Sequence, residues 1–248
     1  MEYQLIATAT FGLEAVVKRE LLDFGYEIIR SEDGKITYRG DEEAIVRSNL
    51  WLRTADRVYI KCAEFEAVTF DELFEHTNSC AWEKIIPEDG KVNVVGTSVK
   101  SELHSVPACQ SIVKKAIVKR LMDKYETDTI PETGPVFTVK ITILKDIVVL
   151  AVDTSGAGLH KRGYRRSDVK APIKETLAAA LVMLSFWRPD RTLVDPCCGS
   201  GTIAIEAAMI GKNIAPGLNR RFASEMWPLI PQEIWHEQRK KALASIDV

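Results

Sequence analysis

Apolar and polar residues alternate over the first third of the chain in a pattern that predicts a β-α-β-β-α-β order. An apolar strand opens the chain, and a turn at Phe11-Gly12 leads into an amphipathic helix that ends near Gly25. Two short strands joined at Asp33-Gly34 indicate a hairpin. A helix over about 41–52 and a strand over about 57–64 follow. This order is typical of a ferredoxin-like domain.

The next part of the chain predicts a second α+β module. A helix is expected over about 69–80 and a strand over 91–97, followed by the long helical pattern "VPACQSIVKKAIVKRLMDKY" with a proline in its first turn. Two apolar strands, Val136–Leu144 and Ile147–Asp153, come after it. The segment "TSGAGLHKRGYRRSDVKAP" is rich in turn residues and is therefore the best candidate for a linker.

Composition places the chain among ordinary globular proteins. Its 248 residues are 46% hydrophobic and 27% charged, with a formal net charge of −2, so nucleic-acid binding would need a local basic patch. The five cysteines have no CxxC spacing and the four histidines no metal-ligand spacing, which argues against a disulfide framework and a metal site and favours a reducing cytoplasm. No signal peptide and no membrane-spanning run is recognisable.

The apolar run Thr192–Val194 predicts a strand, and the stretch "DPCCGSGTIAIEAA", Asp195–Ala208, that follows it predicts a tight turn and a helix. Together they form a ligand-binding device. The first turn of a helix presents unpaired N–H groups, and Gly199 and Gly201 let the backbone approach a ligand closely. A carboxylate at Asp195 suits a cationic group, while the helix N-terminus favours an anionic one. S-adenosylmethionine carries both groups on its amino-acid end.

A nicotinamide dinucleotide is the rival ligand for this turn. Gly199, Gly201 and Ala204 also fit the loose pattern G-x-G-x-x-A. That pattern requires an acidic residue at the end of a second strand about 20 residues further on. The corresponding window, "IAPGLNRRFASEMWPLIPQ", contains three prolines and cannot be a buried strand, which disfavours NAD. A plain tight turn before a packed helix remains a further alternative.

Several stretches resemble one known family. "DPCCGSGTIAIEAAMIGKNIAPGLNRRFASEMWP" looks like the cofactor loop and following insertion of THUMP-domain RNA methyltransferases, and "APIKETLAAALV" resembles the helix before that loop. "GLHKRGYR" is similar to the end of their THUMP domain, "SVKSELHSVPACQSIVKKAIVKRL" to its core, and "ATATFGLEAVVKREL" to their N-terminal opening. The resemblance covers the whole chain. It is greatest to the bacterial group that methylates guanine N2 in 23S ribosomal RNA, often described as N6-adenine-specific DNA methylases.

The resemblance implies a fold class and a domain order. An α+β part, ferredoxin-like plus THUMP, is expected to precede an α/β part, the start of a doubly wound, Rossmann-like methyltransferase domain. The expected boundaries are 1–55 for the ferredoxin-like domain, 56–155 for the RNA-binding THUMP domain, 156–170 for a linker and 171–248 for the methyltransferase part. S-adenosyl-L-methionine is the implied cofactor and RNA the implied partner. The residues expected at the cofactor are Asp195, Pro196, Cys197, Gly199, Ser200, Gly201 and Thr202, with Thr176 on the preceding helix.

The chain departs from this family in its last part. The family's catalytic loop carries an Asn- or Asp-Pro-Pro-Tyr motif, but this sequence contains no Pro-Pro, so no catalytic residue is assigned. The segment from Ala171 to Val248 is also short for an open α/β domain, because each βαβ unit takes ~30 residues or more. The ribose-binding acidic residue is expected beyond Val248. We therefore expect a front fragment of a longer enzyme, inactive by itself, and a non-catalytic THUMP RNA-binding module is the alternative function.

Two basic stretches are candidates for RNA binding. In the linker region, Tyr164 lies among arginines, as in single-strand stacking sites, and only Asp168 opposes the basic residues around it. On the long helix, like charges four residues apart disfavour the helix slightly unless phosphates bind them. The alternative for both is a solvated helix face and a charged linker. The residues selected are Lys115, Lys119, Lys161, Arg162, Tyr164, Arg165 and Arg166.

Overall fold

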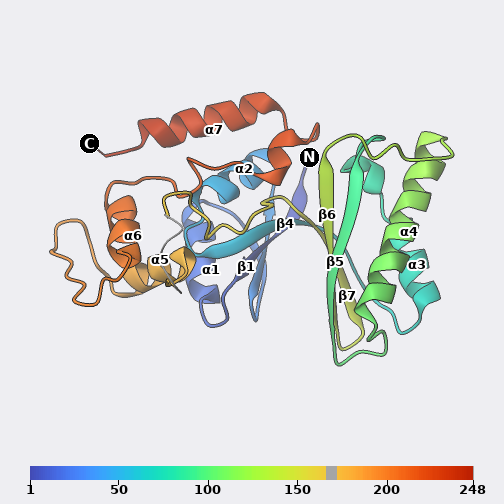
Figure 1. Cartoon of the computed structure of the whole chain (residues 1–248), viewed down its shortest axis with the longest axis horizontal. Coiled ribbons are helices and arrows are strands. Elements are labelled where there is room, and N and C mark those ends of the chain that lie inside the picture. Colours follow the sequence, from blue (N-terminus) through green and yellow to red (C-terminus); the bar gives the residue numbers. More distant parts are fainter. Residues whose placement is uncertain (166–171, 248) are drawn as a thin grey trace. The chain divides into compact units, whose positions relative to one another are not determined.

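The computed structural model of the chain describes residues 1–165 and 172–247, and it divides into two compact units (Figure 1). The first unit comprises Met1–Val58, Thr154–Glu225 and Ile230–Val248. The second comprises Tyr59–Asp153 and Met226–Leu229. Each unit therefore combines segments that are far apart in the sequence.

The first unit opens with the predicted β-α-β-β-α-β order. Its elements are β1 (Tyr3–Ala9), α1 (Glu14–Asp23), β2 (Ile28–Glu32), β3 (Lys35–Gly40), α2 (Glu42–Trp51) and the start of β4 (Ala55–Glu66). The strands lie in the order β2-β3-β1-β4, and β3 is antiparallel to both β1 and β2. Gly34 turns the hairpin with a φ of 72°, a conformation that glycine adopts without strain. The predicted ferredoxin-like topology is confirmed.

The two helices of this fold begin and pack as their sequences dictate. Val17 and Leu21 of α1 are fully buried, as the helical spacing of apolar residues predicts. The side chain of Asp41 accepts a hydrogen bond from the backbone N–H of Ala44 at 2.9 Å and caps α2. After α1 ends, Gly25 adopts a φ of 86°. These local signals fix where each helix starts or stops.

The later segments of the first unit are mainly helical. They form α5 (Glu175–Leu184), α6 (Thr202–Gly211), the 3₁₀ helix η2 (Ala223–Met226), whose last residue belongs to the second unit, and α7 (Gln232–Ala244). A core cluster of Leu13, Val16 and Ala180, with Leu177 and Met183 against it, joins α1 to α5. Figure 1 shows α7 lying along α2, with which it is in contact. The helix predicted before the glycine turn is thus confirmed as α5.

The apolar run Thr192–Val194, predicted as a strand, forms none. Val194 is 79% exposed. A strand needs a neighbour for its backbone N–H and C=O groups, and the described part of the chain contains no strand after β7 (Ile147–Asp153). The expected strand-turn-helix is therefore present as a turn and a helix.

The second unit is a sheet with two helices against it. Besides the rest of β4 it contains α3 (Phe70–Ser79), the 3₁₀ helix η1 (Trp82–Lys84), β5 (Lys91–Val99), α4 (Val106–Tyr125), β6 (Val136–Leu144) and β7. The strand order is β4-β7-β6-β5, with β5 and β6 parallel and the other pairs antiparallel. Figure 1 shows α3 and α4 on the same side of these strands. The elements predicted for this region are confirmed.

A short late segment completes the core of the second unit. Trp227 is 1% exposed, and its ring stacks on Phe137 of β6 at a centroid distance of 4.6 Å. Its Nε1 donates to the carbonyl oxygen of Val136 at 3.3 Å. Tryptophan at this position is thus a core residue. None of the described helices has the length and hydropathy needed to cross a membrane.

Candidate functional site

The glycine loop between Asp195 and Gly201 leads directly into α6. Gly201 is the N-cap of α6 with φ 71° and ψ 14°, and Gly199 has a φ of 51°. A Cβ at either glycine would meet no atom closer than 3.9 Å, so backbone conformation and not crowding requires glycine here. Among the described residues no side chain caps α6, which leaves its first-turn N–H groups available to a ligand.

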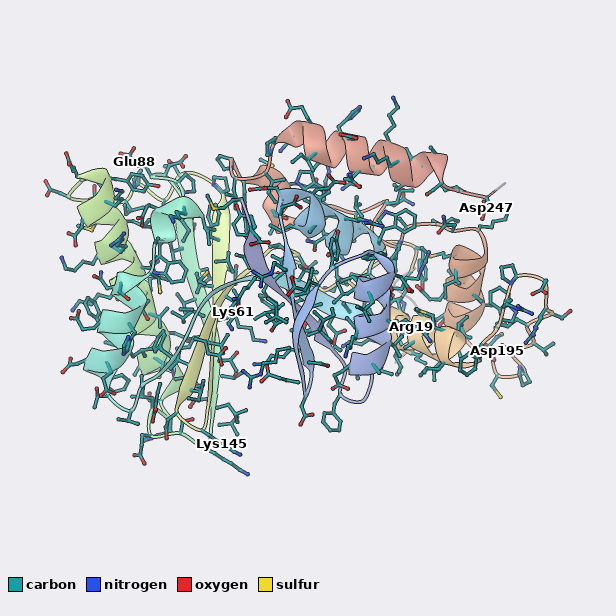
Figure 2. The ribbon with its side chains drawn as sticks, turned by 180° about the vertical axis from the view of Figure 1, so that it is seen from behind. Arg19, Lys61, Glu88, Lys145, Asp195 and Asp247 are labelled. Carbon is teal, nitrogen blue, oxygen red and sulfur yellow. The ribbon has the colours of Figure 1, made fainter. Side chains whose placement is uncertain are left out.

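Asp195 lies at the entry to this loop, as Figure 2 shows. Its Oδ1 accepts a hydrogen bond from the backbone N–H of Cys197 at 3.1 Å, which is an Asx-type turn. Asp195 and Pro196 line a pocket of about 420 Å³, whose apolar wall includes Val182 and Ile203. The carboxylate thus borders both the loop and a cavity large enough for part of a small-molecule ligand.

Of the other residues expected at the cofactor, two lie at least partly at the surface and two are buried. Cys197 is an exposed free thiol, while Ser200 is half-buried. Thr202 is 2% exposed, and its Oγ1 lies 2.8 Å from Ser200 Oγ. Thr176 is fully buried in the first turn of α5, where its hydroxyl donates to Asp56 Oδ1 at 3.2 Å. The hydroxyl of Thr176 is thus already bonded inside the protein, and its contact with the cofactor stays a prediction.

Arg162, expected to contact RNA, is instead buried. Its side chain is 2% exposed and its Nε lies 3.4 Å from Oε1 of Glu206 on α6, which is fully buried. Its guanidinium also donates to the carbonyl oxygens of Leu159, at 2.7 Å, and Arg53. Since a buried charge is tolerated only when it is paired, Arg162 is a structural residue.

Tyr164 and Arg165 also turn inward. The Tyr164 hydroxyl donates to Glu206 Oε1 at 2.8 Å, and burial together with this carboxylate raises the pKa of Tyr164 well above its ordinary value. Arg165 pairs through Nε with Glu175 Oε1 at 3.1 Å and donates through Nη2 to the carbonyl oxygen of Ile173 at 2.7 Å. Neither side chain is presented to RNA as a stacking or phosphate-binding group. The physical reason is the pair of buried carboxylates facing this segment.

The remaining candidates for RNA binding that the structure describes are exposed. Lys161, Lys115 and Lys119 are exposed, and Arg166 lies outside the described residues. Lys115 Nζ lies 5.9 Å from the ring centroid of Phe74, and Lys119 pairs with the exposed carboxylate of Asp123 at 2.9 Å. The α4 lysines thus remain accessible, and their contact with RNA stays a prediction.

Sequence reasoning missed the two carboxylates that organise this region. Glu206 stands alone in the apolar pattern "TIAIEAAMI", and Glu175 opens the alanine-rich helix α5. A single carboxylate among buried apolar positions signals a buried basic partner, because an unpaired charge is costly there. In the described part of the chain, no group of three or more His, Cys, Asp or Glu residues is arranged to hold a metal.

Family models match nearly the whole chain. Residues 4–59 match the RlmL ferredoxin-like domain, residues 67–153 the THUMP domain, and residues 162–247 the RMKL-like, methyltransferase domain. The chain thus has the three domain matches, in the same order, that the resemblance to THUMP-domain methyltransferases implies. The recognition made from the sequence motifs and the expected fold class, ferredoxin-like plus THUMP followed by a Rossmann-like methyltransferase part, are confirmed.

The names of similar proteins agree with these domain matches. "Putative RNA methyltransferase YpsC" of Bacillus subtilis is 57% identical over 240 residues, which is 96% of this chain and 62% of that protein. The crystal structure of "a predicted N6-adenine-specific DNA methylase" from Listeria monocytogenes is 54% identical with a TM-score of 0.96, and the match covers 100% of this chain and 65% of that one. SMU.472, "a putative methyltransferase complexed with SAH", is 46% identical with a TM-score of 0.96, over 99% of this chain and 65% of that one.

The chain spans about 62% of the length of the curated relatives it matches. These matches do not support the expectation that this chain is inactive by itself, because the methyltransferase-domain model matches residues 162–247. The domain boundaries expected from the sequence stay predictions, and so do the site residues other than Arg162, Tyr164 and Arg165.

Proposed function

We propose that this chain takes part in S-adenosylmethionine-dependent methylation of RNA. The methyltransferase-domain match at residues 162–247 and the THUMP match at residues 67–153 support a methyl donor and an RNA substrate on one chain. The relative described as complexed with SAH, the demethylated donor, supports the choice of cofactor. The glycine loop before α6 is the observation that carries the proposal.

The loop fits the amino-acid end of the donor in both charge and shape. Uncapped N–H groups of α6 suit its carboxylate, and Asp195 suits its ammonium group. The glycine conformations at Gly199 and Gly201 keep side chains away from the ligand's path. When bound, the donor supplies the electrophilic methyl group, and this chain's residues bind and orient it.

The proposed substrate is ribosomal RNA, and guanine N2 of 23S RNA is the specific target that the family resemblance implies. The ferredoxin-like and THUMP domains would hold structured RNA by its shape and backbone. The target base would be flipped out toward the donor. We also propose a cytoplasmic location, which is supported by five free cysteines.

Calorimetric titration of this chain with S-adenosylhomocysteine tests the cofactor site. We expect micromolar binding that Gly201→Val abolishes, because valine at a φ of 71° would distort the loop. Gly25→Val is the matched control: Gly25 has a φ of 86°, no atom lies near its missing side chain, and it is far from the loop in sequence. Binding of NADH in place of the donor product would support the rival ligand of the glycine turn, a nicotinamide dinucleotide. If the chain binds neither S-adenosylhomocysteine nor NADH, the result would support the alternative function, a non-catalytic RNA-binding module.

A further inference from the structure

Three residues that precede α5, Arg162, Tyr164 and Arg165, contact Thr202 or Glu206 in the first half of α6. We propose that these three residues, here called the junction clamp, position the first turn of α6 and with it the glycine loop. The inference rests on the proposed function, since it assigns these residues to the support of the cofactor site and not to RNA.

Arg165 links three backbone segments near the loop. Its guanidinium pairs with Glu175 at the start of α5, donates to the carbonyl oxygen of Ile173, and reaches Thr202 Oγ1 at 3.4 Å. Because an arginine only donates, the Thr202 oxygen accepts this contact and its proton can go to Ser200 Oγ, 2.8 Å away. A chain of polar contacts therefore runs from Arg165 into the glycine loop itself.

Arg162 and Tyr164 hold the same helix one turn further along. Both contact Oε1 of Glu206, which is four residues after Thr202 and so lies on the same face of α6. The other oxygen of Glu206, Oε2, is buried without a hydrogen-bond partner among the described residues. The buried carboxylate thus relies on the clamp, and the clamp contacts one face of the helix over its first two turns.

The clamp is in turn fixed to the ferredoxin-like domain. Arg162 donates to the carbonyl oxygen of Arg53, and Arg53 Nη1 donates to the carbonyl oxygen of Ile214, after α6, at 3.0 Å. The backbone N–H of Arg53 donates to Glu20 of α1 at 2.8 Å. Both ends of α6 are therefore tied to the corner between α2 and β4. The methyltransferase-domain match begins at residue 162, which agrees with this assignment.

Binding and exchange measurements on the clamp variants test the proposal. Arg165→Ala removes the contact to Thr202, and Tyr164→Phe removes a single hydroxyl while keeping the ring. Because a loosened support shifts the groups that bind a ligand, we expect Arg165→Ala to weaken S-adenosylhomocysteine binding about tenfold and Tyr164→Phe to weaken it less. Hydrogen exchange of the amides at 205–211, which are bonded within α6, should quicken in both variants while the second unit exchanges as before.

Arg221→Ala is the matched control, because Arg221 is 92% exposed and pairs with one carboxylate, Glu225, at 3.1 Å. It removes the same charge and should change neither measurement. Unaltered affinity in Arg165→Ala, or faster exchange spread over the whole chain, would overturn the positioning role. If the unmodified chain does not bind S-adenosylhomocysteine, the proposed function fails. Exchange of the amides at 205–211 then tests the clamp alone, because faster exchange in the variants supports it and unchanged exchange rejects it.

Discussion

The segment at 161–165 and the helix α4 are both rich in basic residues, yet the structure uses them in opposite ways. Arg162 and Arg165 face two buried or nearly buried carboxylates of the first unit, Glu206 and Glu175. The lysines of α4 face solvent or exposed carboxylates such as Asp123. Basic residues outnumber acidic ones in both stretches. A basic residue whose partner carboxylate is buried supports the fold. A basic residue whose partner carboxylate is exposed stays available to RNA.

Removing the buried cation of Arg162 should change the free energy of unfolding more than removing any other charge in this comparison. Arg162→Ala leaves Glu206 charged and buried, and we expect it to lower the free energy of unfolding by about 3–5 kcal/mol. Thermal and urea unfolding measure the change. The double variant Arg162→Met with Glu206→Leu should recover part of the loss. An apolar pair needs no compensating charge, but the carbonyl oxygens of Leu159 and Arg53 lose their donor. A loss below about 1 kcal/mol for Arg162→Ala, typical of exposed pairs, would show that the pair is not buried in solution.

Removing one hydroxyl from the same cluster should have a smaller effect. Tyr164→Phe deletes the hydrogen bond to Glu206, and we expect a loss of about 1–3 kcal/mol, because a charged acceptor loses a donor. Urea unfolding of Tyr164→Phe beside Tyr125→Phe gives a comparison with a hydroxyl of the second unit that donates to the carbonyl oxygen of Ile86 at 2.8 Å. An equal or larger loss for Tyr125→Phe would contradict the assignment of the greater contribution to the charged acceptor.

The ion pair between Arg120 of α4 and Glu83 extends the comparison to the second unit. Arg120 donates to both carboxylate oxygens, at 3.1 and 2.7 Å, and this holds the pKa of Glu83 below its ordinary value of 4.5. A carboxyl with a lowered pKa stabilises the fold above the unfolded-state value, and the stabilisation is lost as pH falls through the folded-state value. Arg120→Ala should therefore be less stable than the parent chain near neutral pH by about 1 kcal/mol or less.

The two stability curves should begin to converge as the pH falls below about 4.5, and they should meet once the pH has passed the lower folded-state pKa of Glu83 in the parent chain. Unfolding midpoints measured between neutral pH and acid pH check this. Curves that stay parallel over the whole range would mean that Arg120 stabilises the protein by packing its stem and not by its charge.

Local pattern was enough to predict the elements, because their signals lie within a few residues of each other. The hairpin at Asp33-Gly34 and the buried face of α1 needed only turn chemistry and a 3.6-residue period. The glycine conformations at Gly199 and Gly201 agree with the turn predicted there. The strand expected at Thr192–Val194 failed because a strand depends on a neighbour that no local pattern reveals.

The side-chain roles were harder to predict than the elements. Arg162 and Glu206 are 44 residues apart, and Thr176 and Asp56 are 120 residues apart. Pairing over such distances follows from packing, and a single sequence holds no direct signal of it. A charged residue within an apolar pattern is a local sign that the residue has a buried partner. Glu206 shows this sign, whereas nothing in the sequence around Thr176 indicates that its hydroxyl is bonded inside the protein.

The smallest expected effect on stability concerns Lys119, and it tests the outward-facing side of the comparison. Lys119→Ala removes both the pair with Asp123 and the like-charge neighbour of Lys115, so we expect a change in the free energy of unfolding within about 0.5 kcal/mol. Its effect should appear in RNA binding instead. If Lys119 neutralises one phosphate, the slope of log K against log salt for a single-stranded RNA should fall by about 0.7 in magnitude. Arg165→Ala should leave that slope unchanged, because its guanidinium is bonded inside the protein. A changed slope for Arg165 with an unchanged one for Lys119 would reverse the assignment of the two basic stretches, and would return the RNA contact to the segment at 161–165.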